Sequence, residues 1–336
     1  MIRALYIILT LLITNHSLYG QNRVLQQEVD NEFYNATKKW FSAWELVSKE
    51  TYHIEKVQPV DFIFFDDEFV YSTSNITVNK ENTVKGNNLI NLKLKWRQAS
   101  HNGSITLPDQ SVVPVQLMCF ASSATDSITK SNKPFFVMPL PSFWDKQKVT
   151  SKEFGEDKLI TGVFIHEFSH SQQMKNFGKK ISEFEKQNNF NIPLTDNIVQ
   201  NIFEENTNYV KLNTAEIETF FKALDNKTIN KQLIRNGLKL MSQRQNQFFT
   251  GEYQSLKAMD DLFLTMEGLG QYSMYRWLIH PKGGNIPQSI VIQGVRRGGK
   301  QWSQDEGFAL FLILEKLSNS RSWAKSMFGN EVISVN

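Results

Sequence analysis

A five-residue pattern in the middle of the chain combines three side chains that can do metal chemistry. His166, Glu167 and His170 form an H-E-x-x-H motif within LITGVFIHEFSHSQQM, residues 159–174. On a helix, residues i and i+4 lie one turn apart on the same face, so both imidazoles can bind one ion. The carboxylate of Glu167 points to the side, where it can accept a proton from a zinc-activated water. The motif predicts a zinc-binding helix with Glu167 as the general base.

The composition makes this motif uncommon as a coincidence. With six histidines among 336 residues, a chance H-E-x-x-H has a probability of roughly 1% or less. The apolar residues Val163, Phe164, Ile165 and Phe168 predict a buried helix, which a zinc site in a protein core requires. The alternative interpretation is two hydrogen-bonded core histidines beside an unrelated glutamate.

The motif HEFSH and its apolar flanks resemble those of the zincin superfamily of metallopeptidases. The resemblance covers only a small part of the chain. It implies a zincin-like α+β fold, in which a small N-terminal sheet is followed by a mainly helical half that carries the motif helix. It also implies a bound Zn²⁺ cofactor and a peptide or protein substrate.

A catalytic zinc ion takes three protein ligands, so the motif needs a third residue. Gln173 and Asn176 stand where the metzincin type of motif has Gly and His, which excludes that class. The short gluzincin spacing, with Glu about 19 to 20 residues after the second histidine, falls on Asn189 and Phe190 and fails as well. The other histidines after residue 20 lie in turn-like or isolated contexts: His53, His101 and His280.

Glu267 is the third ligand that we expect from the sequence. It lies among apolar residues in the helical segment DDLFLTMEGLGQYSMYRWL, residues 260–278, where a buried carboxylate needs a partner and a metal would supply one. Gly268 and Gly270 lower helix propensity, which a second helix packed closely at that point would explain. The string EGLGQY also resembles the Glu-Gly-x-Ala type of segment that bears the third ligand in several gluzincin families.

Other glutamates remain open as ligands. Glu306, in QWSQDEGFALFLIL, shares the Glu-Gly pattern at the start of an apolar helix. A carboxylate at that position is also explained as a first-turn acid that interacts with the helix dipole. Glu204 and Glu205 fit a solvated helix face better than a metal site.

Residues that could stabilise negative charge on a reacting oxygen are less distinct. The candidates are Tyr209, Tyr272, Tyr275 and His280. Core packing is the simpler interpretation of the tyrosines. For Arg296 and Arg297, a solvated loop is a simpler interpretation than a grip on a substrate carboxylate.

The first twenty residues have the layout of a secretory signal peptide. Arg3 precedes an apolar run from Ala4 to Ile13, and a short polar stretch ends at Gly20. The run is about ten residues, too short for the roughly 20 that a membrane-spanning helix needs. We expect cleavage near Gly20 and export to the periplasm or the extracellular space. No later stretch is apolar enough to span a membrane, and we expect the single cysteine, Cys119, to be buried.

Two regions follow the signal peptide and must position the motif. Residues 21–150 predict an N-terminal helix, over about 28–50, and a β-rich part in which NLINLKLKW alternates like a half-buried strand. The apolar segment 133–141 has flanking prolines that indicate an edge strand, which either pairs with a substrate peptide or is simply protected from aggregation. Residues 151–336 predict mainly helices, with a Gly/Pro-rich connection at 281–301 and a final helix at 305–317.

Composition and charge exclude several classes of function. There are 37 Lys and Arg against 34 Asp and Glu, giving a net charge of +3. No long basic run occurs, so nothing points to nucleic acid. One cysteine excludes an internal disulfide and a cysteine-based zinc site. The sequence predicts an exported zinc metallopeptidase. The alternatives are a non-enzymatic exported binding protein with a structural or degenerate metal site, and a zinc hydrolase of another amide, such as one in cell-wall material.

Overall fold

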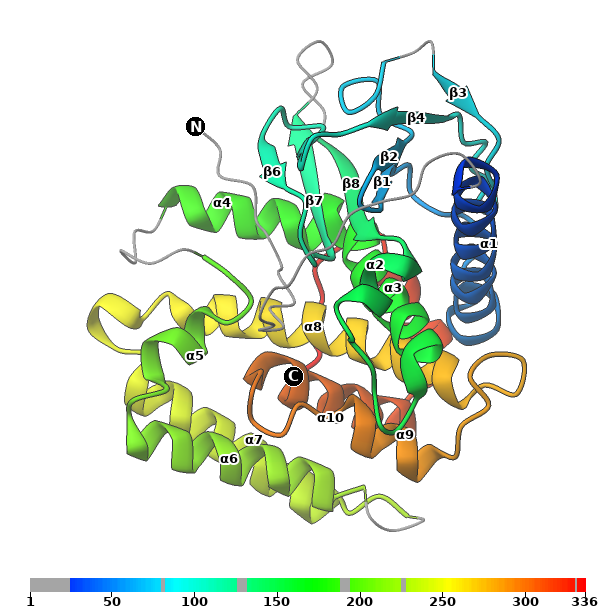
Figure 1. Cartoon of the computed structure of the whole chain (residues 1–336). Coiled ribbons are helices and arrows are strands. Elements are labelled where there is room, and N and C mark those ends of the chain that lie inside the picture. The colour runs from blue at the N-terminus through cyan, green and yellow to red at the C-terminus, as the bar shows by residue number, and fades with distance from the viewer. Residues whose placement is uncertain (1–24, 80–81, 126–131, 188–193, 225–227, 330) are drawn as a thin grey trace. The chain divides into compact units, whose positions relative to one another are not determined.

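The computed structural model describes residues 25–79, 82–125, 132–187, 194–224, 228–329 and 331–336 (Figure 1). These residues form a mixed α+β protein with a small sheet in the N-terminal part and helices through the remainder. The predicted α+β class, with a small N-terminal sheet and a helical half after it, is therefore confirmed. The predicted signal peptide, residues 1–20, lies outside the described residues.

The chain divides into two compact units. The first contains the described part of Met1–Gln172 together with Trp277–Pro287, and the second contains Gln173–Arg276 and Gln288–Asn336. The division that the sequence suggests, into residues 21–150 and 151–336, stays a prediction.

The first unit carries every described strand. Its strands are β1 (Asp61–Phe65), β2 (Phe69–Ser72), β3 (Thr83–Val84), β4 (Trp96–Ser100), β5 (Ser104–Thr106), β6 (Val112–Pro114), β7 (Phe120–Thr125) and β8 (Asn132–Pro139). Its helices are α1 (Leu25–Leu46), which continues into a π-helical turn (Val47–Tyr52), α2 (Pro141–Lys146) and α3 (Gly155–Gln173).

The second unit is helical in its described residues. Its α-helices are α4 (Lys179–Gln187), α5 (Ile198–Phe203), α6 (Thr207–Lys222), α7 (Lys231–Phe248), α8 (Leu256–Ile279), α9 (Gln288–Val295), α10 (Trp302–Leu317) and α11 (Ala324–Met327). The part of α8 up to Arg276 belongs to this unit. Short turns add a π-helix (Met174–Gly178) and two 3₁₀ helices (Gly251–Tyr253 and Ser320–Ser322).

The main sheet has the strand order β3-β4-β2-β1-β8-β7, in which β1 and β8 run parallel and every other pair is antiparallel. The prediction of an edge strand at 133–141 is wrong, because β8 pairs with β1 on one side and β7 on the other. The prolines do not interrupt this pairing. On the β1 side, Pro134 precedes the ladder, which starts at Phe135, and Pro139 ends it. On the β7 side, Pro134 lies opposite Ser123 within the ladder. A proline at the end of a ladder removes no hydrogen bond from the middle of a sheet.

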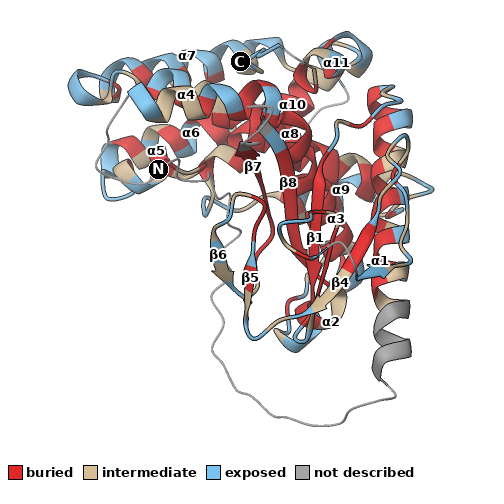
Figure 2. Cartoon of the chain, turned by 90° about the horizontal axis from the view of Figure 1, so that it is seen from above, coloured by how far each residue is buried: buried red, intermediate tan, exposed pale blue. Residues whose placement is uncertain are grey.

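The two faces of the sheet bury different sets of side chains. Successive residues of a strand point to opposite faces. Phe62 and Phe64 of β1 therefore face the helices, with ring centroids 5.5 Å from Phe168 of α3 and 5.2 Å from Trp40 of α1. Ile63 and its neighbours join an apolar cluster on the other face. Both β1 and β8 are coloured as buried in Figure 2. This packing fixes α3, the helix that carries the motif, against the sheet.

Two other expectations about local structure are wrong. In NLINLKLKW only the final Trp96 begins a strand, because Leu89 and Leu92 close a tight turn around Ile90 at φ +50°. The Gly/Pro-rich segment 281–301 contains helix α9, whose first residue, Gln288, follows Pro287 directly. A proline there is compatible with the helix, because the first helical N–H groups need no partner within the helix. The helices predicted at 28–50 and 305–317 are confirmed as α1 with its π-helical turn and as α10.

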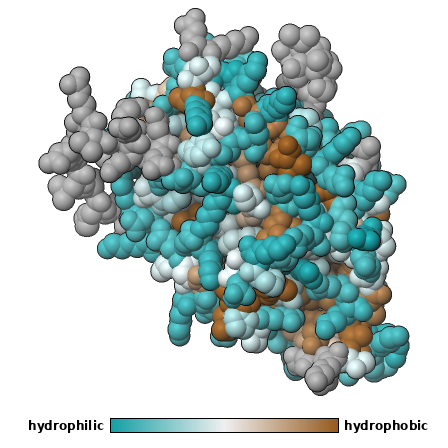
Figure 3. Space-filling view, turned by 90° about the vertical axis from the view of Figure 1, so that its right-hand side faces the viewer, coloured by the Kyte–Doolittle hydropathy of each residue, from teal (hydrophilic) through white to brown (hydrophobic). Residues whose placement is uncertain are grey.

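The surface shows no continuous apolar belt on the face drawn in Figure 3, where hydrophilic side chains predominate and hydrophobic ones are scattered. Single exposed apolar residues of this kind are ordinary for a folded chain. Within the described ranges, no helix combines the length and the apolar character needed to cross a membrane.

Candidate metal centre

The motif helix α3 is buried on all sides from Ile160 to Gln173. As predicted, Val163, Phe164, Ile165 and Phe168 are all at most 3% exposed. Other polar residues of the helix serve its own structure. The hydroxyl of Ser169, for example, donates to the carbonyl oxygen of His166 at 2.6 Å. A buried helix of this kind holds its motif side chains in a dry, rigid setting.

The two motif histidines face each other. The Nε2 atoms of His166 and His170 are 3.1 Å apart, and their rings meet nearly at right angles, at 85°. In a tetrahedral zinc site, Zn–N bonds of about 2.0–2.1 Å place two ligand nitrogens roughly 3.3 Å from each other. The spacing of the pair therefore fits two ligands of one zinc ion.

Glu167 lies on the same turn of α3 and is only 1% exposed. The single cysteine, Cys119, is also buried, as predicted. Burial raises the pKa of Cys119 well above its usual value, and the negative charge of Glu167 raises it further. Burial of this kind is typical of a structural cysteine rather than a reactive one.

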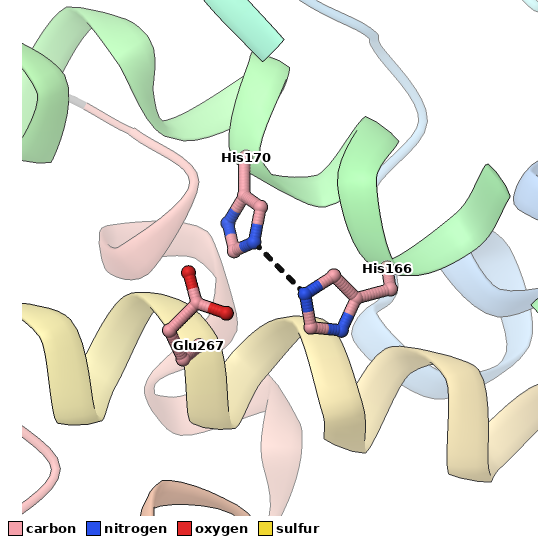
Figure 4. Close-up of side chains that lie close together, drawn as sticks. All are labelled: His166, His170 and Glu267. Carbon is pink, nitrogen blue, oxygen red and sulfur yellow. Dashed lines mark hydrogen bonds between the residues drawn. The ribbon is translucent and has the colours of Figure 1, made fainter. Parts of the chain in front are cut away.

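Glu267 comes together with the histidine pair in the structure. His166, His170 and Glu267 each offer one ligand atom, and these atoms all lie within 4.8 Å of one another (Figure 4). All three residues are at most 3% exposed. Among the described residues, no other set of three or more His, Cys, Asp or Glu side chains is arranged to hold a metal ion. Two imidazoles and one carboxylate are a donor set that catalytic zinc sites use.

Two glycines allow the helix of Glu267 to touch α10. A Cβ atom on Gly268 would lie 2.5 Å from the carbonyl carbon of Gly307, and one on Gly307 would lie 2.2 Å from the carbonyl oxygen of Leu264. Neither distance is possible for real atoms, so both positions require glycine. The expectation that a second helix packs closely at Gly268 is confirmed, and that helix is α10.

Polar residues of the second unit surround the carboxylate of Glu267. The side-chain amide of Gln304, on α10, donates from Nε2 to Oε2 of Glu267 at 3.0 Å. Asp196 is also buried nearby. Burial raises the pKa of Asp196 well above its usual value, and the charge of Glu267 acts in the same direction.

Glu306, the alternative metal ligand, is bound by an arginine. Its two carboxylate oxygens each lie 3.2 Å from Nη2 of Arg244. The same guanidinium makes a two-point contact with Glu216, at 2.7 and 3.0 Å, and a third contact with Asp260 at 3.1 Å. Glu306 is 2% exposed. The first turn of α10 contains Asp305 rather than Glu306, so the interpretation of Glu306 as a first-turn acid that interacts with the helix dipole is wrong. It belongs to a buried ion-pair cluster around Arg244.

The remaining histidines have local roles. His280 makes a 3.0 Å contact with the carboxylate of Glu50, and a ring nitrogen of His101 lies 2.9 Å from the carbonyl oxygen of Asp66. His53 is exposed and ends the π-helical turn after α1 at φ +56°. The structure groups none of them with the motif.

The other candidates also divide between packing and solvent. Tyr272 and Tyr275 pack against the aromatic rings of α10, as their apolar setting suggested. The hydroxyl of Tyr209 accepts a hydrogen bond from Arg244 at 2.7 Å. Glu204 and Glu205 are exposed, as predicted. Arg296 forms an ion pair with Glu218 and lies over the ring of Phe221, 3.9 Å from its centroid.

Gln304 and Arg244 were not found from the sequence. Gln304 lies two residues before the Glu-Gly pair of α10 and has no feature that separates it from the other glutamines. Arg244 follows Arg235 on the same amphipathic helix, yet one is buried and the other exposed. The glycines were the signal that a close helix contact existed, but the sequence did not say which helix made it.

No family model, curated protein or solved structure matches this chain. The chemistry of the motif residues and their neighbours is therefore what indicates a function.

Proposed function

We propose that this chain is a zinc-dependent hydrolase of peptide bonds, a metallopeptidase of the zincin type. The observation that carries the proposal is the buried group of His166, His170 and Glu267, whose ligand atoms lie within 4.8 Å of one another. It is supported by Glu167, which follows the first histidine directly and is buried with it.

His166, His170 and Glu267 would hold the ion. Bound zinc acts as a Lewis acid and lowers the pKa of water towards neutrality. Glu167 accepts the proton of the attacking water and passes it to the leaving nitrogen, so the residue acts first as a base and then as an acid. The imidazoles act only as ligands and must stay neutral to bind.

The fold supports the same proposal. A small sheet precedes α3, and helices follow it, which is the zincin-like order of elements. Since β8 is an interior strand, the strand that an extended substrate would join is β7, at the end of the strand order. Among the described strands, β7 pairs only with β8. Its outer backbone groups could hydrogen-bond a peptide by strand addition.

We further propose that the protein is exported, because residues 1–20 have the pattern of a signal peptide. The substrate would then be a peptide or protein outside the cytoplasm. An amide in cell-wall material would be cleaved by the same chemistry, and substrate assays distinguish the two.

Metal content and a single charge-removing substitution test the proposal. We expect the purified wild-type protein to contain about one zinc ion per chain, and His170→Ala to lose it. Glu167→Gln should keep the zinc. Its rate of hydrolysis of a peptide library should fall at least about 100-fold, because the proton acceptor is gone. A wild-type protein that binds no zinc even after zinc is added back would contradict the proposal and favour the non-enzymatic binding protein.

A further inference from the structure

Gln304 connects Glu267 to two other polar groups of the second unit. Its side chain is buried, at 2% exposure. It donates from Nε2 to Glu267 at 3.0 Å, and its Oε1 accepts from Nε2 of Gln271 at 2.5 Å and from Nε of Arg297 at 2.9 Å.

These contacts define which end of the Gln304 amide faces Glu267. The Nε–H of an arginine is always a donor, so the atom of Gln304 that meets Arg297 must be the oxygen. The nitrogen is then the atom that meets the carboxylate of Glu267. The orientation of the amide therefore follows from its partners rather than from an arbitrary choice between oxygen and nitrogen.

Backbone geometry brings Gln304 within reach. Glu267 directly precedes Gly268 on α8, and Gln304 lies one turn before Gly307 on α10. Because α8 and α10 touch at these two glycines, the amide spans the gap without a water between the two side chains. A side chain at either glycine would push the helices apart and lengthen this hydrogen bond.

The loop that supplies Arg297 is also anchored to α10. The carboxylate of Asp305, which follows Gln304, accepts from the backbone N–H of Arg297 at 2.5 Å and of Gly299 at 2.9 Å. The loop is thereby held where Nε of Arg297 meets Gln304.

We propose that Gln304 is a positioning residue for the third metal ligand, with Gln271 and Arg297 fixing its amide so that it holds Oε2 of Glu267 in one orientation. This inference rests on the proposed function, because it assigns Glu267 to the metal. A neutral amide suits the task, since it restrains the carboxylate without cancelling the charge that a cation requires. Hydrogen bonds of this kind to metal ligands typically change metal affinity by about 10- to 100-fold.

Gln304→Met tests the proposal, and Gln245→Met is its matched control. Gln245 is a buried glutamine of the same unit, and its amide donates to the carboxylate of Asp260 at 3.1 Å. Both substitutions keep the size of the side chain and remove an amide-to-carboxylate hydrogen bond. Gln304→Met also removes the hydrogen bonds from Gln271 and Arg297, so we expect a loss of Tm in both variants and the larger loss in Gln304→Met. Zinc affinity, measured by competition with a chelator, should fall about 10- to 100-fold in Gln304→Met and stay at the wild-type value in Gln245→Met.

Two further measurements separate positioning from a general structural effect. The visible absorption of the cobalt-loaded protein, which reports the geometry of the ligands, should change in Gln304→Met and not in Gln245→Met. In a Glu267→Ala background, Gln304→Met should weaken metal binding no further, because it acts through the missing carboxylate.

The outcomes also separate this proposal from the one on which it rests. A wild-type protein without zinc affinity would overturn both. A wild-type protein that binds zinc, with equal affinity and an equal cobalt spectrum in Gln304→Met, would overturn only the role of Gln304. Equal weakening in Gln304→Met and Gln245→Met would also overturn it, because the effect would then be one of stability alone.

Discussion

The second unit contains the same dipeptide twice, and the two copies have different surroundings. Glu267-Gly268 lies on α8 and Glu306-Gly307 on α10, both glutamates are nearly inaccessible to solvent, and the helices touch at the two glycines. Glu306 is bound by the guanidinium of Arg244. Glu267 is bound by the neutral amide of Gln304 and groups with two histidines.

The difference teaches that the neighbours, rather than the dipeptide, decide what a buried carboxylate does. A guanidinium supplies the positive charge that buried Glu306 needs, so this residue links α10 to Arg244 of α7. An amide orients Glu267 without adding charge, which suits a ligand of a divalent cation. The two glycines explain why the dipeptide repeats, since each is needed where the two backbones meet.

The largest effect that we expect is a loss of stability when Arg244, the partner of Glu306, is removed. Arg244→Met leaves Glu216, Asp260 and Glu306 buried without their shared guanidinium. Removing one partner of a buried ion pair costs about 3–5 kcal/mol, so the free energy of unfolding should fall by that amount in urea denaturation. Arg235→Met, an exposed position on the same helix, is the control and should change it by at most about 0.5 kcal/mol. Equal stability of Arg244→Met and the wild type would show that the cluster is not what holds Glu306.

The next effect distinguishes the two glutamates by metal binding. Glu267→Gln should weaken zinc affinity at least about 100-fold, more than the loss of a hydrogen bond to a ligand, because the charged ligand becomes neutral. Glu306→Gln should leave zinc affinity unchanged, because Arg244 keeps Glu216 and Asp260 as partners. Chelator competition measures both. The reverse pattern would move the third ligand to Glu306 and refute the assignment of roles made above.

The sequence predicted which residues lie together at the motif better than it predicted their surroundings. The spacing of His166 and His170 is local, so helical geometry alone places both on one face. Glu267 was suggested by a local feature too, the glycine beside it. Gln304 and Arg244 act through contacts between helices far apart in the chain, which no periodicity encodes. The edge-strand prediction at 133–141 failed for the same reason, because prolines describe a strand's ends but not which strands lie beside it.

The smallest effect concerns pH and Glu306. Burial raises the pKa of Glu306 well above its usual value, and the nearby Glu216 adds to this, although Arg244 opposes it. A carboxyl group whose pKa is higher in the folded state contributes stability below its unfolded pKa, and that contribution is lost as the pH rises through the folded value. Glu306→Gln cannot ionise and escapes this loss. Its unfolding free energy relative to the wild type should therefore increase between pH 4 and pH 8, by on the order of 1 kcal/mol. Urea denaturation at both pH values measures the change. A relative stability that stays constant, or decreases, would mean that Arg244 keeps Glu306 ionised throughout and that the two copies of the dipeptide differ less in charge than in geometry.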